Sequence, residues 1–512
     1  MNQKRVILQG AMILTVVGFI SRIIGFFYRI FLSRAIGAEG VGIYQLIFPV
    51  YTMAFSLTAS GIQTAISRNV SGRMAVGDRR GARDIFAAGL ILTTAGTILA
   101  SLFLHRGAGW IAADLLKESR CESLIRLLAF ALPFAGIHSC VGGYYFGLKK
   151  TNIPAISQLI EQAARVSVSY LVYLIFLEKG LRPTPILAVI GLICEEFASA
   201  LFSMSAAALH FGRLKLRQTI PGLQTPFRNI LQLSLPLTAN RVLINLLQSV
   251  EAVCIPLRLQ MSGLTVSSSL SVYGILTGMA LPLVLFPSAI TSAVSVMLLP
   301  TVSEAQASGR HGRISRTLES TVCYSLILGI LCIGIFLCFG EDMGRILFGN
   351  ALAGKFILIL AWICPFLYLG TTLSSILNGM GKAMTTFWQN TVSLLIRILF
   401  VWFAVPRFGI TGYLWGLLFS QLLSAAMALA ALSGCVDFHF DSIGWIVKPA
   451  FTLCVSTGVM LFFRTALTQF IRDISPLLEM FLSVSVLCAV YIGSMFFSQI
   501  YILLQRKGIL KA

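Results

Sequence analysis

Charged residues are scarce in this chain, and their scarcity excludes most soluble folds. Only 11% of its 512 residues are charged, whereas 57% are hydrophobic and the mean hydropathy is +0.87. A soluble domain carries about 25% charged residues. No polar stretch is long enough to fold as a separate catalytic domain. The composition therefore predicts an all-α polytopic membrane protein.

Motifs for metal, redox and nucleotide chemistry are also missing. The eleven cysteines stand singly in apolar segments without a Cys-x-x-Cys pair, and the five histidines are far apart in the sequence. Such cysteines behave as small buried hydrophobic residues rather than disulfides or metal ligands. The glycine turns also lack the Walker pattern. We expect no enzyme activity, no metal and no cofactor, apart from possible coupling to an ion gradient or to the membrane potential.

Apolar windows of helix length predict about 14 transmembrane helices. The windows span residues 6–33, 41–67, 84–104, 124–147, 154–177, 184–210, 229–255, 268–299, 317–339, 355–378, 384–405, 410–433, 443–463 and 475–504. Pro282 and Pro287 are expected to bend the eighth of these.

The basic residues give the chain a net charge of +20 and collect at every second connection. In a membrane protein this pattern marks cytoplasmic loops rather than nucleic-acid binding. It predicts that both termini are cytoplasmic. The basic residues on the predicted cytoplasmic side are Lys4, Arg5, Arg68, Arg73, Arg79, Arg80, Arg83, Lys149, Lys150, Arg213, Lys215, Arg217, Arg228, Arg310, Arg313, Arg316, Lys382, Lys448, Arg506, Lys507 and Lys511.

An internal repeat occurs at an offset of 232 residues, which relates Pro133, Lys150 and Arg165 to Pro365, Lys382 and Arg397. A parallel repeat indicates two lobes related by a pseudo-two-fold axis along the membrane normal, with a substrate site between them. We therefore predict a six-helix lobe over residues 1–228, a second over 229–435, and two additional helices over 436–512.

The first helix carries Gly18, Arg22, Gly25 and Arg29 at spacings that place all four on one face. Arginine inside a membrane usually faces protein or a water-filled cavity. This row of glycines and arginines on one helix face thus predicts a cationic cleft. The alternative is helix packing through the glycines, with Arg29 extending to the interface.

Further ionisable residues lie in the predicted spans. Glu161 and Arg165 are four residues apart and are expected to form an ion pair. Arg165 and Arg397, at equivalent repeat positions, could bind a diphosphate or anchor their helices. The remaining candidates are Glu195 and Glu196, which either couple transport to an ion or stay protonated, and Arg241 and Glu251 at the two ends of the seventh span.

Three segments resemble the stage V sporulation protein B family of the multidrug/oligosaccharidyl-lipid/polysaccharide flippase superfamily. They are Ser21–Arg29 (SRIIGFFYR), Ile36–Tyr44 (IGAEGVGIY) and Gly61–Arg68 (GIQTAISR). Phe286–Ser288 and Leu298–Ser303 also resemble the eighth helix of lipid II flippases.

The resemblance implies a flippase that moves an undecaprenyl-diphosphate-linked sugar to the outer leaflet, by alternating access, for spore cortex synthesis. It also implies that the last two helices form a groove for the lipid tail, and cell-wall synthesis proteins are possible partners. Two alternatives stay open: a proton- or sodium-coupled antiporter of organic cations, and a membrane scaffold without transport activity.

Overall fold

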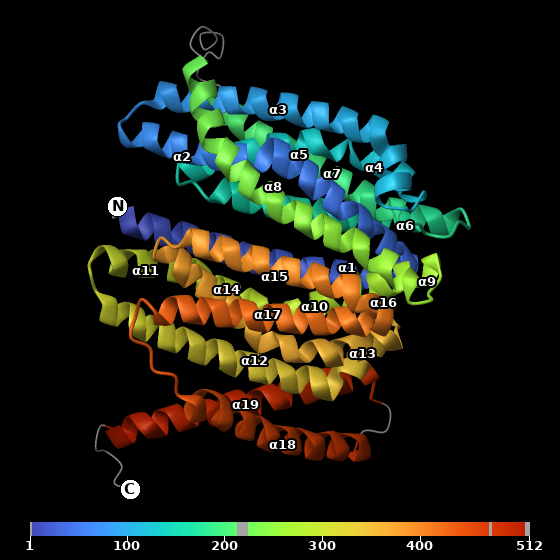
Figure 1. Ribbon diagram of the computed structural model, residues 1–512, viewed down its shortest axis with the longest axis vertical. Helices are drawn as coiled ribbons and strands as arrows, with labels where there is room; N and C mark the ends of the chain where they lie inside the picture. The colour runs from blue at the N-terminus through green and yellow to red at the C-terminus, as the bar shows by residue number, and fades with distance from the viewer. Residues whose placement is uncertain (1–2, 212–223, 471–473, 507–512) are drawn as a thin grey trace. The chain divides into compact units, whose positions relative to one another are not determined.

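The computed structural model describes residues 3–211, 224–470 and 474–506, which form helices joined by short connections (Figure 1). No strand occurs in these ranges. Because the backbone of a membrane span must satisfy its own hydrogen bonds, helices are the form that this apolar sequence adopts. Five residues expected on cytoplasmic loops lie outside the described residues: Arg213, Lys215, Arg217, Lys507 and Lys511.

The chain divides into two compact units, which are described separately. The first comprises Met1–Gly278 and Arg397–Tyr413, and the second Met279–Ile396 and Leu414–Ala512. This division differs from the predicted lobe boundary at residue 228 because α8 packs along α1, α2 and α3 of the first unit. The repeat-related lobes themselves stay a prediction.

The first unit contains α1 (Gln3–Phe55), η1 (Ser56–Ser60), α2 (Gly61–Ala75), α3 (Arg79–Trp110), η2 (Ile111–Leu115), α4 (Cys121–Leu128), α5 (Ala131–Gly147), α6 (Asn152–Glu178), α7 (Ile186–Phe211), α8 (Gln224–Met261), α9 (Val266–Gly274) and α16 (Val405–Phe408). The helices η5 (Ile275–Ala280), α15 (Ala383–Phe403) and α17 (Ile410–Ser433) continue from one unit into the other. The second unit adds α10 (Leu281–Leu285), α11 (Ser288–Ala307), α12 (His311–Phe348), α13 (Ala351–Leu360), η6 (Ala361–Ile363), α14 (Cys364–Gly379), η7 (Ile443–Val447), α18 (Lys448–Phe470) and α19 (Pro476–Arg506).

Fourteen helical segments in the described ranges are long and apolar enough to cross a membrane, which confirms the predicted all-α fold class. They divide the chain differently from the prediction at two places. The predicted helices 6–33 and 41–67 belong to one segment, Met12–Ala75, whereas the predicted helix 268–299 is divided between Val266–Leu285 and Ser288–Ala307. Phe286 and Pro287 separate the two pieces, so the bend expected at the prolines is a break.

Gly37 interrupts the first segment with φ 70° and ψ 177°, a conformation that favours glycine. A segment of 64 residues would otherwise be about three times as long as the membrane is thick. Figure 1 shows α1 running away from the N-terminus and α2 lying back on the N-terminal side. The segment therefore supplies two spans, as the hydropathy pattern predicts.

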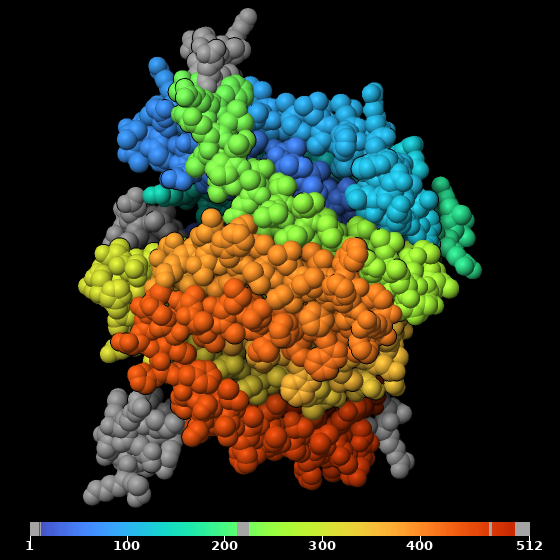
Figure 2. Space-filling view, in the orientation of Figure 1, coloured from blue at the N-terminus to red at the C-terminus, as the bar shows by residue number. Residues whose placement is uncertain are grey.

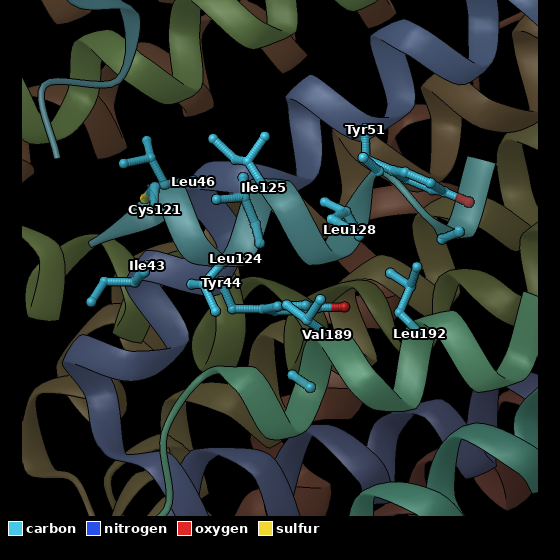
Figure 3. Packing of buried hydrophobic residues seen from close by; sticks show 14 of the residues in the cluster. Ile43, Tyr44, Leu46, Tyr51, Cys121, Leu124, Ile125, Leu128, Val189 and Leu192 are labelled. Carbon is cyan, nitrogen blue, oxygen red and sulfur yellow. The ribbon is translucent and has the colours of Figure 1, made fainter. Parts of the chain in front are cut away.

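A hydrophobic core holds the second half of α1 against α4 and α7 (Figure 3). Tyr44, Ile125 and Leu192 are among its buried members. Close backbone approach adds to this packing, since a side chain at Gly42 would overlap the carbonyl of Leu270 on α9. Small residues allow such approach in membranes, where van der Waals packing drives helix association.

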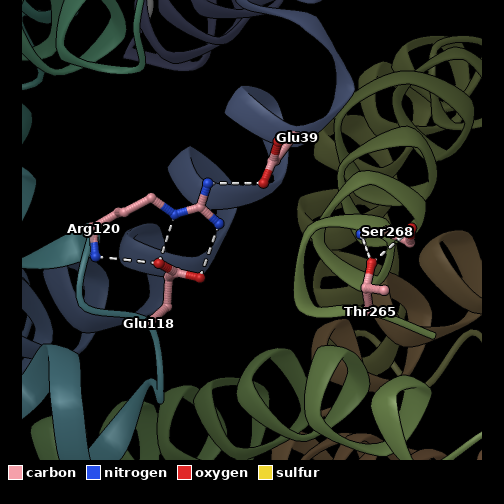
Figure 4. A network of polar contacts seen from close by, with 5 residues as sticks. All are labelled: Glu39, Glu118, Arg120, Thr265 and Ser268. Atoms are coloured by element: carbon pink, nitrogen blue, oxygen red, sulfur yellow. Dashed lines mark hydrogen bonds and ion pairs between the residues drawn. The ribbon is translucent and has the colours of Figure 1, made fainter. Parts of the chain in front are cut away.

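Arg120, in the connection before α4, fixes the chain just after the Gly37 break (Figure 4). Its guanidinium donates to Glu118 Oε1 at 2.7 Å and to Glu39 Oε1 at 2.8 Å. These hydrogen bonds from Arg120 hold the pKa of the Glu118 carboxyl below its usual range. The contact joins α1 to the connection between α3 and α4.

The second unit has a core formed by α11, α12, α14 and α17. The last two membrane helices, α18 and α19, pack against each other and against α12. Tyr491 on α19 donates a hydrogen bond to the carbonyl of Ile327 at 3.0 Å. On the face shown in Figure 2, side chains fill the spaces between neighbouring helices of each unit.

Candidate functional site

A cluster of ionisable side chains lies inside the first unit, where α1, α5, α6 and α7 meet. It contains four residues that the sequence analysis selected and two that it did not select, His138 and Tyr51. The selected members are Glu161, Arg165, Glu195 and Glu196. Charges in a membrane protein interior require partners, so the contacts within the cluster define what it can do.

Arg165 pairs with Glu195 and not with Glu161, so the predicted pairing along α6 is wrong. Arg165 Nε lies 3.1 Å from Glu195 Oε2, and the guanidinium packs over the ring of Tyr28 at 5.2 Å. Glu195 is only 8% exposed. The ion pair with Glu195, on the facing helix α7, compensates the charge of each buried group.

The other two carboxylates face His138 on α5. Glu161 Oε1 lies 3.1 Å from His138 Nδ1, and Glu196 Oε2 lies 3.4 Å from Nε2. Ser199 donates a hydrogen bond to Glu161 at 2.8 Å, and Tyr51 donates one to Glu196 at 2.8 Å. Glu195 and Glu196 thus point to different neighbours, as expected for adjacent residues on a helix.

Arg22 and Arg29 of α1 have no ion pair or hydrogen bond within the first unit as the structure describes it. On the same helix Gly25 lies beside Gln162, the residue to which Arg165 donates a hydrogen bond. Arg22 and Arg29 therefore remain available to an anion.

Arg241 belongs to a ladder of polar contacts along α8. It donates to the carbonyl of Ser60 at 3.0 Å and to the hydroxyl of Thr64 at 3.3 Å. Asn245 and Ser249, one and two turns further along, contact Ser56 and the carbonyl of Pro49. Ser60 ends the π-helix η1, whose wider turn disturbs the regular hydrogen bonding. Arg241 therefore fastens α8 to α2.

Arg397 and Glu251 form a second ion pair, apart from the cluster. The guanidinium donates to both carboxylate oxygens at 2.6 Å, and Tyr413 donates a further hydrogen bond at 2.8 Å. Glu251 is 4% exposed. A bidentate pair with an additional donor satisfies the carboxylate completely, so this site locks α8, α15 and α17 together.

The second unit contains a largely apolar groove of about 730 Å³. It lies among α11, α12, α14 and α19, and Arg313 and Arg316 lie at its lining. Ile290, Leu328 and Phe496 are among its apolar wall residues. Such a groove suits an alkyl chain with an anionic end.

No group of three or more metal-ligating side chains occurs among the described residues. All eleven cysteines are free.

Two signals could have revealed the residues that sequence reasoning missed. His138 is the single histidine of the apolar helix Ala131–Gly147, and Asn245 and Ser249 follow the selected Arg241 at successive spacings of four. The partners of these residues lie on other helices, however, so no pattern along one helix identifies the contacts that the residues make.

These features define a multi-pass membrane protein with a transporter fold. The solved lipid II flippase MurJ, in an inward closed conformation, superposes with a TM-score of 0.68 at 14% identity, covering 96% of this chain and 100% of that chain. A multidrug resistance transporter of the MATE family has TM-scores of 0.64 in its inward-facing and 0.58 in its outward-facing conformation, each at 14% identity. These two comparisons cover 83% of this chain, and 99% and 96% of the respective transporter chains.

The sequence itself specifies the family. The profile of polysaccharide biosynthesis proteins matches residues 7–306, and the chain belongs to this family. The MatE profile matches residues 242–403. Stage V sporulation protein B of Bacillus subtilis (strain 168) is 28% identical over 437 residues, 84% of each chain. Lipid II flippase MurJ of the same organism is 24% identical over 425 residues, 77% of this chain and 76% of the relative. The predicted resemblance is confirmed.

Proposed function

We propose that this protein is a flippase for an undecaprenyl-diphosphate-linked sugar, a peptidoglycan or polysaccharide precursor. It moves the precursor from the cytoplasmic to the outer leaflet of a bacterial cell membrane by alternating access, and both termini are cytoplasmic. Family membership supports the substrate class. The name of the sporulation relative supports use in spore cortex synthesis. The inward- and outward-facing conformations of a protein with this fold support the mechanism.

The observation that carries the proposal is the pair of unpartnered arginines on α1. A guanidinium inside the membrane is stabilised by an anion, and it binds phosphate oxygens through paired hydrogen bonds. Arg165, Arg241 and Arg397 already donate to protein groups. We therefore assign the diphosphate first to Arg22 and Arg29, and assign supporting roles to the other three arginines.

The groove in the second unit supports a lipid substrate. Its apolar lining fits a polyprenyl tail, and Arg313 and Arg316 add positive charge beside the lining. With the tail in an apolar groove, only the headgroup has to be shielded from a hydrocarbon layer about 30 Å thick.

Transfer of a labelled lipid-linked sugar diphosphate between leaflets tests the function. Purified protein in proteoliposomes is compared with Arg22→Ala, Arg29→Ala and the control Arg106→Ala, which removes an exposed arginine from α3. A charge-assisted hydrogen bond contributes about 1.5–3 kcal/mol, so we expect at least about tenfold slower transfer in the α1 variants. Equal rates in all four proteins contradict the assignment of the arginines.

A second candidate is an antiporter of organic cations, which is favoured by the carboxylates of the cluster and by the MATE-like fold. Efflux of an organic cation under a proton or sodium gradient, without transfer of the lipid-linked sugar by the wild-type protein, would establish this function instead.

A further inference from the structure

His138 lies between two carboxylates that come from different helices. Nδ1 faces Glu161 on α6 and the hydroxyl of Ser199, and Nε2 faces Glu196 on α7. A neutral imidazole has one N–H, whereas an imidazolium has two. Only the protonated ring donates toward both carboxylates, so the geometry of the site specifies a bound proton.

The charge balance of the cluster leads to the same conclusion. Of its three carboxylates, Glu195 pairs with Arg165, and Glu161 and Glu196 remain beside the imidazole. Glu196 Oε2 is buried without a hydrogen bond, and the Tyr51 hydroxyl donates to the other oxygen of the same carboxylate. Two unneutralised carboxylates in a membrane interior are costly, and a proton held by His138 reduces this charge.

Among the described residues, His138 has ion-pair contacts with Glu161 and Glu196 alone. The groups that act on its charge are Glu161, Glu195 and Glu196. From α2 the neighbouring polar group is the neutral amide of Gln63, and from α3 the neutral hydroxyls of Thr93 and Thr97 approach α5 at Gly136. Sodium is a poor alternative to the proton at this site. Of the three side chains His138, Glu161 and Glu196, one is an imidazole, whereas hard cations prefer oxygen ligands.

A polar cavity of about 240 Å³ provides a path for the proton. His138 and Glu161 line it together with Gln63, Gln158, Ser157 and Ser203. It also reaches Phe146 and Ile153, which flank the basic turn at Lys149 and Lys150. A cavity of this size and polarity holds water, so the site is connected toward the side of that turn.

We propose that His138, clamped by Glu161 and Glu196, is the proton-binding site that couples a proton gradient to transport. Proton binding draws α5, α6 and α7 together through one cation, and proton loss leaves two carboxylates that repel each other. The coupling rests on the proposed function, whereas the binding of the proton does not.

The proton site is tested on purified protein without substrate, by following nitrogen-15-labelled histidine in a pH titration. We expect an imidazole signal that disappears in His138→Gln and whose midpoint changes in Glu161→Gln and Glu196→Gln. The control is His105→Gln, because the ring of His105 faces the carbonyl of Arg126 and no carboxylate. A His138 midpoint unaffected by either glutamine substitution, or a signal that responds to sodium instead, overturns the proposal.

Coupling is tested in proteoliposomes by the leaflet distribution of the labelled lipid-linked sugar under a gradient of one pH unit. For one coupled proton we expect a shift of up to about tenfold in the wild type and in His105→Gln, and none in Glu196→Gln. If the leaflet distribution produced by the wild-type protein does not depend on the pH gradient, the coupling is overturned. Absence of any transfer overturns the proposed function, while the titration of His138 still decides the proton site.

Discussion

At the scale of the single residue, what an arginine contacts decides how it can act. Arg165 forms an ion pair with buried Glu195 and donates a hydrogen bond to Gln162. Arg397 donates to buried Glu251, and Arg241 donates to a backbone carbonyl. Each of these arginines therefore already has a protein partner that competes with a phosphate. Arg22 and Arg29 have no such partner among the described residues of the first unit. This difference is the reason for proposing that Arg22 and Arg29 bind the ligand and that the other three arginines stabilise the fold.

The Glu118–Arg120 pair gives a pH dependence of stability. Because Arg120 lowers the pKa of Glu118 in the folded protein, the pair contributes stability above the ordinary glutamate pKa of about 4.3. This contribution is lost as the pH falls through the lowered value. We expect Glu118→Gln to lower the free energy of unfolding by about 1 kcal/mol or less at pH 7, and by progressively less as the pH falls below the ordinary glutamate pKa.

Thermal unfolding in detergent across this pH range measures the effect. The matched control is Glu122→Gln, which removes a carboxylate from an exposed pair with Arg126. A difference between wild type and Glu118→Gln that stays constant down to pH 3 contradicts the assignment.

Sequence reasoning found the charged residues of the site but not all of their partners. Spacing along one helix predicted a Glu161–Arg165 pair, whereas Arg165 pairs with Glu195 from α7. Spacing reports only neighbours on the same helix. The pairing of Glu195, Glu161 and His138 depends on how three helices pack, which a single sequence does not contain.

At the scale of the element, the polar ladder makes α8 a part of the first unit. Three of its residues, Arg241, Asn245 and Ser249, contact the segment between Pro49 and Thr64. Gly61 permits this approach, since a methyl group there would overlap Thr238 and come within 3.0 Å of the carbonyl of Ser234. The helix order alone would have assigned α8 to the second half of the repeat.

Gly61→Ala tests how closely α2 and α8 pack. We expect the substitution to destabilise the protein by about 1–3 kcal/mol, because the added methyl group forces the two helices apart. Gly72→Ala on the same helix is the control, since nothing lies within 4 Å of its added methyl group. Melting temperatures of the two variants give the comparison. Equal melting temperatures would show that α8 can move away from α2 without cost.

Hydropathy predicted the helices well because each span needs a continuous apolar run. It could not place the junctions that depend on backbone conformation. Gly37 interrupts the first segment without a change in hydropathy, and Phe286–Pro287 divides a run that remains apolar on both sides. The π-helical turns, such as Ser56–Ser60, have no signature in the composition either.

At the scale of the whole molecule, the basic connections predict the orientation in the membrane. The two ends of α3 differ, since Arg79, Arg80 and Arg83 stand at its start and a mixed-charge connection follows its end. The positive-inside rule therefore predicts that the start of α3 is cytoplasmic.

Cysteine labelling in intact cells tests this orientation. We expect a membrane-impermeant maleimide to label Ser119→Cys and not Arg80→Cys, both of which are exposed positions. Permeabilised cells provide the control, in which both variants become labelled. The opposite pattern in intact cells would reverse the orientation of the whole protein.

The Glu251–Arg397 pair has a consequence for how the chain is made. Its two members are 146 residues apart, so Glu251 leaves the ribosome long before the arginine that neutralises it. At about 5–20 residues per second, synthesis of the residues between Glu251 and Arg397 takes on the order of ten seconds. During that interval the Glu251 side chain on α8 has to stay in contact with water or with the insertion machinery, or it has to be protonated. Completion of the first unit therefore depends on the synthesis of most of the second.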